Sequence, residues 1–290
     1  MKSLLVILLI PVAAAAQKIP FRQYRAGKTT VYTLTSESYN NNKFSGKSIS
    51  RAKLTVIKDT AGFAEAIQWL GKTHFSSKDT VNLDSTAQKI KPYTISLSPG
   101  KKVLLPRLDN AEMVGDITDL NTFFVAVSPA LNMQKLSAAN PVFTNEKYAE
   151  GNFADGVKII KGSDCIRVTQ TLVKISKKYT VIKTDFLPPV TSCLTPLLDT
   201  ISKKTFEHPN NFQMVQQSAG GKVNLLWGNE SFTITSTIDN KDGKLLEATM
   251  TNTLQLRMRI NAAPDLQTYD FELPYTISRN LKLELTAVKK

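Results

Sequence analysis

The chain has 290 residues, 42% of them hydrophobic, and is therefore long enough to bury a sizeable core as one large domain or two smaller ones. Its 37 lysines and arginines outnumber its 24 aspartates and glutamates, which gives a net charge of +13 at pH 7. Beyond the N-terminal residues no run of about 18 apolar residues occurs, which excludes a membrane-spanning helix from the expected mature chain.

The first 16 residues show the three-part pattern of a secretory signal peptide. Lys2 gives a positive start, Leu4 to Ile10 is a short apolar run, and Ala14 to Ala16 are small residues before Gln17. We therefore expect an exported, periplasmic or extracellular protein of a Gram-negative bacterium, with a mature chain of residues 17–290. Export argues against nucleic acid as a partner. The positive charge then indicates an anionic envelope surface, with a solvated lysine-rich face as the alternative.

Alternation of apolar and polar residues predicts antiparallel hairpins in the first part of the mature chain. The expected strands are Val31–Ser38, Ser48–Lys58, Phe63–Leu70 and Tyr93–Leu97. A broader apolar pattern over 117–136 predicts a helix, broken at Pro129. Ser128 is read there as a helix cap followed by proline at the first helical position.

The same alternation returns in the second half of the chain. The expected strands are 166–172, Tyr179–Phe186, Phe212–Gln217, Val223–Trp227 and 232–238. Thr195 and Pro196 repeat the cap-then-proline pattern and predict a short helix over 195–202. We favour a single β domain over 17–290, with two lobes, 17–140 and 141–290, as the alternative.

The two longest alternating stretches lie near the C-terminus. In Leu246–Ile260 every even position except Asn252 is apolar and every odd position is polar. In Tyr269–Leu285 one parity is apolar, interrupted only by Arg279. Each pattern predicts a strand with one dry and one wet face, far longer than the usual five or six residues. The fold class is therefore mostly β: long antiparallel strands in a curved sheet, a half-barrel or a sandwich, with one or two short inserted helices.

The dry faces of these two stretches supply the candidate ligand-binding residues. Methionine suits an irregular apolar pocket, and so large a dry surface must curl around another sheet, an inserted helix or a ligand. The candidates are Met250, Leu254, Leu256, Met258, Phe271, Leu273 and Tyr275. A packed sandwich core is the alternative reading of the same residues.

No pattern of catalytic or metal-binding residues stands out, and no cofactor is expected. The two histidines, His74 and His208, accompany no nucleophile motif. Aligning Gly243 with the glycine of a calcium loop places Ile238 and Thr249 where carboxylates are needed, so a hairpin turn explains Asp239–Gly243 better.

Carboxylates and tryptophans provide the remaining candidates for an enzyme site. A glycan hydrolase would need two facing carboxylates, and nothing pairs any two of Asp185, Asp199, Glu207 and Glu247. Trp69 and Trp227 are read as packing residues, with a sugar-stacking platform as the alternative.

Cys165 and Cys193 are the two cysteines of the chain. In an oxidising compartment, one disulfide is the simplest expectation, with two buried free thiols as the alternative.

Long one-sided strands, a cleaved leader and a helix able to fill the concavity together resemble the periplasmic lipoprotein carriers. The strands in question are FTITSTIDNKDGKLLEATMTNTLQLRMRI and TYDFELPYTISRNLKLEL. Those proteins are open β half-barrels that shelter acyl chains while moving lipids or lipid-modified proteins between membranes. The resemblance covers about the last fifth of the chain and matches no lipid-contacting residue, and the mature chain is longer than such carriers.

The resemblance implies a non-enzymatic exported protein that binds a lipid or another apolar ligand in the cell envelope, without a stable membrane span. A structural or adhesion sandwich is the alternative, and a glycan hydrolase a weaker one. The oligomeric state is left open.

Overall fold

A computed structural model describes residues 19, 22–59, 62–96, 110–128, 136–146, 149–152, 158–161, 167–188, 190, 210–264 and 266–289. The expected signal peptide, the expected helix over 195–202, His208 and both cysteines lie outside these residues. No helix of the described residues is long and apolar enough to cross a membrane.

Strands make up most of the described chain, as the alternating patterns predict. In the first half they are β1 (Thr29–Asn40), β2 (Lys43–Asp59), β3 (Gly62–Phe75), β4 (Thr80–Asn82), β5 (Tyr93–Ile95), β6 (Val142–Glu146) and β7 (Ala149–Asn152). In the second half they are β8 (Lys158–Lys161), β9 (Arg167–Ile175), β10 (Tyr179–Leu187), β11 (Phe212–Gln217), β12 (Val223–Asp239), β13 (Leu245–Ala262) and β14 (Phe271–Lys289).

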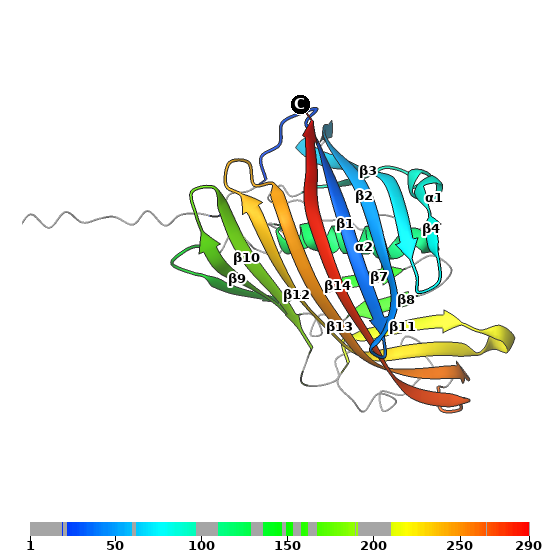
Figure 1. Ribbon diagram of the computed structural model, residues 1–290. Coiled ribbons are helices and arrows are strands. Elements are labelled where there is room, and N and C mark those ends of the chain that lie inside the picture. Colours follow the sequence, from blue (N-terminus) through cyan, green and yellow to red (C-terminus); the bar gives the residue numbers. More distant parts are fainter. Residues whose placement is uncertain are drawn as a thin grey trace, which may run out of the picture.

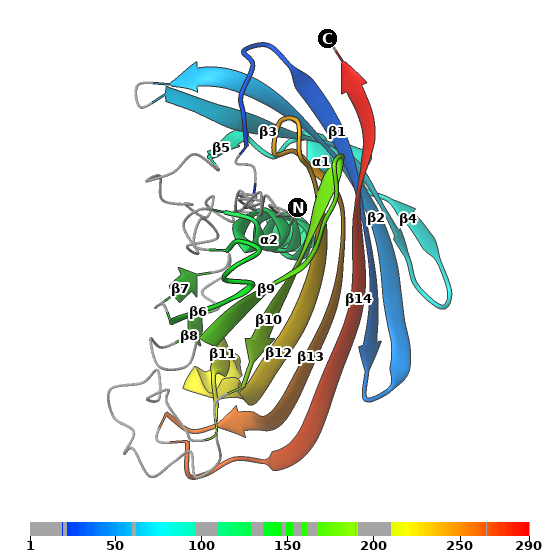
Figure 2. The ribbon, with the colours of Figure 1, turned by 90° about the vertical axis from the view of Figure 1, so that its left-hand side faces the viewer.

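These fourteen strands form one antiparallel sheet with the main order β4-β3-β2-β1-β14-β13-β12-β10-β9-β6. The first strand of the chain pairs with the last, so that β1 joins Val31 to Ala287 and Leu34 to Leu283. The sheet is open and strongly curved, and β11, β8 and β7 continue it around the concave side (Figures 1 and 2). The expected curved β sheet is therefore confirmed, and the described strands form this one sheet rather than the two stacked sheets of a sandwich.

Helix α2 (Ala111–Ala126) lies on the concave side of the sheet, where Figure 2 shows it nearly end-on. Its buried apolar residues Met113, Ile117, Leu120, Phe123 and Phe124 join the main core with residues of β1, β2, β3, β12, β13 and β14. Large apolar side chains at three- and four-residue spacing give the helix one face to bury.

The predicted bounds of this helix, 117–136, are wrong. It begins after Asn110, whose side chain accepts a hydrogen bond from the backbone N–H of Glu112, and it ends at Ala126. Ser128 therefore lies two residues beyond the end of this helix, and residues 129–135 lie outside the described part of the chain. The residue before a proline disfavours helical backbone, so Ser128–Pro129 is a stop signal at this position.

β12 is one strand where two were predicted. Its first half pairs with β11 and its second half with β10, so the sheet forks between Gly228 and Phe232. The buried side chain of Asn211 bridges the fork: it accepts a hydrogen bond from the Glu230 N–H (2.7 Å) and donates one to the Glu230 carbonyl (2.9 Å). Gly228 has φ 149°, which glycine adopts readily, and passes close to the β13 backbone.

Three short elements lie along the edge of β3 that does not pair with β2. β5 pairs with residues 65–67, β4 pairs with residues 73–75, and helix α1 (Asp84–Gln88) contacts the stretch between them. There the Lys72 N–H donates to Asp84 Oδ1 (2.9 Å), and Gln88 Nε2 donates to the Leu70 carbonyl (3.0 Å).

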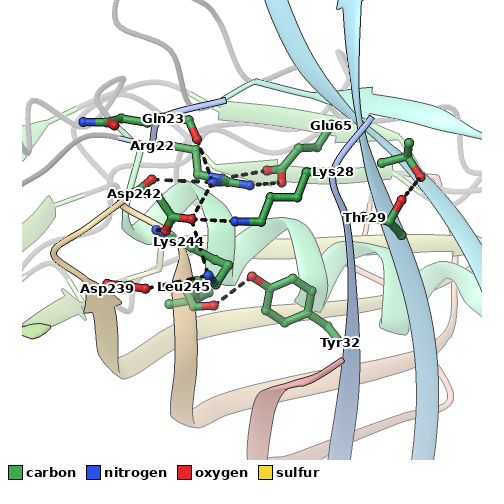
Figure 3. Close-up of polar contacts among 11 residues, drawn as sticks. Arg22, Gln23, Lys28, Thr29, Tyr32, Glu65, Asp239, Asp242, Lys244 and Leu245 are labelled. Atoms are coloured by element: carbon green, nitrogen blue, oxygen red, sulfur yellow. Dashed lines mark hydrogen bonds and ion pairs between the residues drawn. The ribbon is translucent and has the colours of Figure 1, made fainter. Parts of the chain in front are cut away.

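A cluster of charged side chains joins the segment before β1 to the β12–β13 turn (Figure 3). Arg22 pairs with Glu65 of β3 (2.7 Å), and Lys28 pairs with Asp242 of the turn (3.0 Å). Burial acts to raise the pKa of the Asp242 carboxyl. The hydrogen bond from Lys28 and the attraction of Lys244 and Arg22 outweigh burial and leave that pKa below its ordinary value.

Candidate functional site

The even positions of β13 face the concave side, as the alternating sequence predicts. Ala248, Met250, Leu254 and Leu256 are buried, whereas Thr249, Thr251, Gln255 and Arg257 are exposed. Directly paired residues of antiparallel strands lie on the same face of a sheet. The pairing of Leu256 with Tyr275, of Met258 with Leu273 and of Ile260 with Phe271 therefore continues this face into β14.

All seven predicted ligand-binding residues thus lie on one face, but in two environments. Met250 is 4% exposed and belongs to the main core that α2 covers. The other six form what we call the distal apolar face, beyond the helix. Its residues are Leu254, Leu256, Met258, Phe271, Leu273 and Tyr275.

The distal apolar face is buried at one side and exposed at the other. Leu254 and Leu256 pack with Phe212 of β11 and Leu226 of β12 in a second apolar cluster. At the start of β14, Phe271 is 63% and Leu273 45% exposed. The role of these six residues in ligand binding stays a prediction.

A band of polar residues separates the two apolar regions. The two exceptions to the apolar patterns, Asn252 of β13 and Arg279 of β14, are direct cross-strand partners, and Ser38 of β1 pairs with Arg279 in turn. Asn252 Nδ2 donates to Glu230 Oε1 (3.1 Å), and Arg279 forms a two-pronged ion pair with Asp119 of α2, with Nη1 3.0 Å from Oδ1. We call Ser38, Glu230, Asn252 and Arg279 the polar band.

Beside the polar band a hollow of about 310 Å³ lies between the first turns of α2 and strands β1, β2, β3 and β14. Four serines, His74 and five charged side chains of these elements border it, together with Lys47, Gly46 and Gly115. In this region of the concave side, therefore, the structure provides a polar recess and not an apolar cavity.

Two ion pairs attach α2 to the sheet at this hollow. Asp116 and Asp119 are three residues apart and so share a face of the helix. Lys72 Nζ of β3 lies 2.6 Å from Asp116 Oδ2 and also donates to the Glu112 carbonyl, and Ser50 donates to Asp116. Burial raises the pKa of the Asp119 carboxyl, although Arg279 opposes part of this rise.

The described residues considered for an enzyme site lie in separate places. His74 lies in β3 and borders the hollow. Trp69 belongs to the main core, whereas Trp227 belongs to a separate cluster and stacks with Arg259 on the opposite face of the sheet, so the two form no common platform. Within the described residues no group of three or more histidines, cysteines, aspartates or glutamates is placed to hold a metal ion.

The carboxylates named for a hydrolase are likewise apart where they are described. Asp185 of β10 accepts a hydrogen bond from Thr233 (2.7 Å), and Glu247 of β13 is exposed on the convex face. Asp199 and Glu207 lie outside the described residues.

The polar hollow and band were not predicted from the sequence. The available signal was the pair of exceptions, Asn252 and Arg279, within otherwise apolar patterns. Recognising their meaning required the β13–β14 register, which places them opposite each other.

Comparison with known proteins gives no family assignment. No family model matches the chain, and no curated protein shows significant sequence similarity. Among solved structures, one of lipovitellin, concerned with lipid–protein interactions in that protein, is similar over 92% of this chain with a TM-score of 0.47 and 10% identity. The aligned part is 26% of the lipovitellin chain.

Proposed function

We propose that this protein is an exported, non-enzymatic binding protein that holds a lipid or another apolar ligand on the distal apolar face. The observation that carries the proposal is the exposure of large apolar side chains on the concave side of the sheet, at Phe271 (63%) and Leu273 (45%). Apolar surface of this kind gains free energy when it is covered, at roughly 25 cal/mol per Å².

The surroundings of these residues support a ligand with a long apolar part. Met258 and Tyr275, partly buried, continue the same face toward the buried Leu254 and Leu256. A flexible methionine and an aromatic ring adapt to acyl chains of differing shape. Export is proposed on the pattern of the first 16 residues, and the basic charge of the chain favours contact with anionic envelope surfaces.

Native mass spectrometry of protein purified from its host, before and after organic extraction, tests the proposal. We expect lipid masses that extraction removes. The delipidated protein should then bind a fluorescent fatty-acid probe, and a Phe271→Ser/Leu273→Ser variant should bind it at least about tenfold more weakly, since each replacement removes apolar contact area.

Val142→Ser is the matched control, because Val142 is 55% exposed but belongs to edge strand β6 and faces the convex side by its pairing with Thr171. This variant should bind the probe like the unmodified protein. Absence of any bound lipid, together with equal probe binding by both variants, would show that the distal apolar face is not a ligand site.

A further inference from the structure

The hollow beside α2 is a polar recess whose charges are mostly neutralised within its own wall. Lys72 is paired with Asp116, and Arg279 with Asp119. Lys47 also borders the hollow, but its ammonium group pairs with Glu37 on the convex face (3.0 Å). None of the three cations bordering the hollow is therefore left to balance an added anion.

The polar groups without such a partner are of a different kind. Glu112 lies in the first turn of α2, and its side chain is exposed. The His74 imidazole and the Ser38 hydroxyl complete this set. A carboxylate, an imidazole and a hydroxyl together suit a ligand group that donates hydrogen bonds and carries a positive charge. Any negative charge of the ligand is then balanced by a positive charge of the same ligand.

β14 leads from the hollow, which Arg279 borders, to the distal apolar face. Arg279, Ile277, Tyr275 and Leu273 are successive concave positions of this strand, about 6.6 Å apart. The concave surface therefore changes from polar at Arg279 to apolar at Ile277 within one such step. Ligand pockets usually measure about 300–1,000 Å³, so the recess of about 310 Å³ accommodates a headgroup while an attached chain lies outside it.

We propose that the hollow binds the polar headgroup of an amphiphile, and that this headgroup is zwitterionic and bears an amine, as phosphoethanolamine does. The acyl chain of the same molecule then lies on the distal apolar face. This inference rests on the proposed function, and it adds the chemical class of the ligand. It also assigns a use to a polar region of the concave side that an apolar chain does not favour.

Three probes with one identical acyl chain separate headgroup from chain: lysophosphatidylethanolamine, lysophosphatidylglycerol and a monoacylglycerol. Each is titrated calorimetrically, below its micelle concentration, into the delipidated protein. We expect lysophosphatidylethanolamine to bind more tightly than lysophosphatidylglycerol. Glu112→Gln should weaken the binding of lysophosphatidylethanolamine by about two- to five-fold, the effect of losing an exposed ion pair, and change that of the monoacylglycerol by less than about two-fold.

A second variant fills the hollow. A Cβ atom added at Gly115 of α2 meets no atom within 4 Å, so Gly115→Gln places a side chain at the recess without a clash at its base. It should weaken binding of both phospholipid probes by about tenfold or more and leave the melting temperature unchanged or raised, because glycine is a poor helix former. Glu247→Gln, an exposed carboxylate change on the convex face, is the control and should change nothing.

The outcomes distinguish this inference from the proposed function. If all three probes bind but lysophosphatidylglycerol equals or exceeds lysophosphatidylethanolamine, the headgroup assignment is wrong and the apolar site stands. If Gly115→Gln and Glu112→Gln both bind every probe like the unmodified protein, the hollow is not the headgroup site. If none of the probes binds, the proposed function fails as well.

Discussion

Replacing Met250 and Leu273 by alanine compares the two environments of the predicted binding stripe. Met250 is 4% exposed, pairs with Ile234 and Leu281, and packs in the core that α2 covers. Truncation of a buried methionine leaves a cavity and costs roughly 2–5 kcal/mol. Leu273 is 45% exposed, so only about half of its full burial energy of 1.5–3 kcal/mol is at stake, or about 0.8–1.6 kcal/mol.

Urea unfolding of the delipidated variants, followed by far-UV circular dichroism, measures both costs. Added lipid then provides the second test. A ligand at 100 times its dissociation constant raises the free energy of unfolding by about 2.7 kcal/mol, provided that it binds only the folded state. We expect Leu273→Ala to lose part of this gain and Met250→Ala to keep it.

A larger cost for Leu273→Ala than for Met250→Ala in the delipidated protein would contradict this reasoning. It would mean that protein atoms already fill the space above the distal apolar face. Equal gains from lipid in both variants would remove Leu273 from the binding surface.

Three further predictions concern register, charge and redox state. Leu256→Asp buries an unpaired charge and should lower the free energy of unfolding by about 3 kcal/mol or more. Thr253→Asp on the wet face should change it by less than about 0.5 kcal/mol. Urea unfolding of both variants checks the strand register, because a one-residue slip would exchange the two results. Because the pKa of Asp242 is lowered by folding, its charge stabilises the fold above about pH 4, the ordinary carboxyl range, and this contribution is lost as pH falls further. Asp242→Asn should therefore destabilise the protein at pH 7 and do so less and less below about pH 4, and a cost that grows on acidification would refute the assignment. Thiol labelling of the unfolded, non-reduced protein should find neither Cys165 nor Cys193 free, and two labelled cysteines would rule the bond out.

The strands were predictable because alternation with a period of two survives wherever one face is dry. It fails in β12, where Leu225, Leu226 and Trp227 are all buried in succession. There both faces of the sheet are covered, Leu226 packing in the concave cluster and its two neighbours in a cluster on the other side. The segment Val223–Trp227 is nevertheless predicted as a strand. The prediction breaks at 228–231, where Gly228, Asn229 and Ser231 are residue types typical of turns.

Helix α2 was predicted in kind but displaced in position. The sequence pattern includes the apolar residues of its second half, but it also assigns the serine–proline pair after the helix to a helix start. Sequence spacing alone does not decide between the two roles, because proline is common both at the first position of a helix and shortly after a helix end. The start of α2 is set by the Asn110 cap, which is recognised only once the backbone structure is known.

For the candidate site, the apolar residues were predictable and the charged ones were not. Lys72, Asp116 and Arg279 are far apart in the sequence and meet only through the sheet order and the crossing of α2. Burial of charges depends on such tertiary pairing, which no local pattern encodes.

The short elements along the edge of β3 that does not pair with β2 protect the protein against aggregation. An open sheet of long strands ends in rows of unpaired N–H and C=O groups, which invite another chain to add as a further strand. Along β3 these groups are already engaged: β5 takes residues 65–67, Gln88 and Asp84 bond at Leu70 and Lys72, and β4 takes residues 73–75. The two strands that end the main sheet order, β4 and β6, have only three and five residues, so a second molecule finds little template there for strand addition. The concave side can therefore stay open without exposing the long strands to edge-to-edge association.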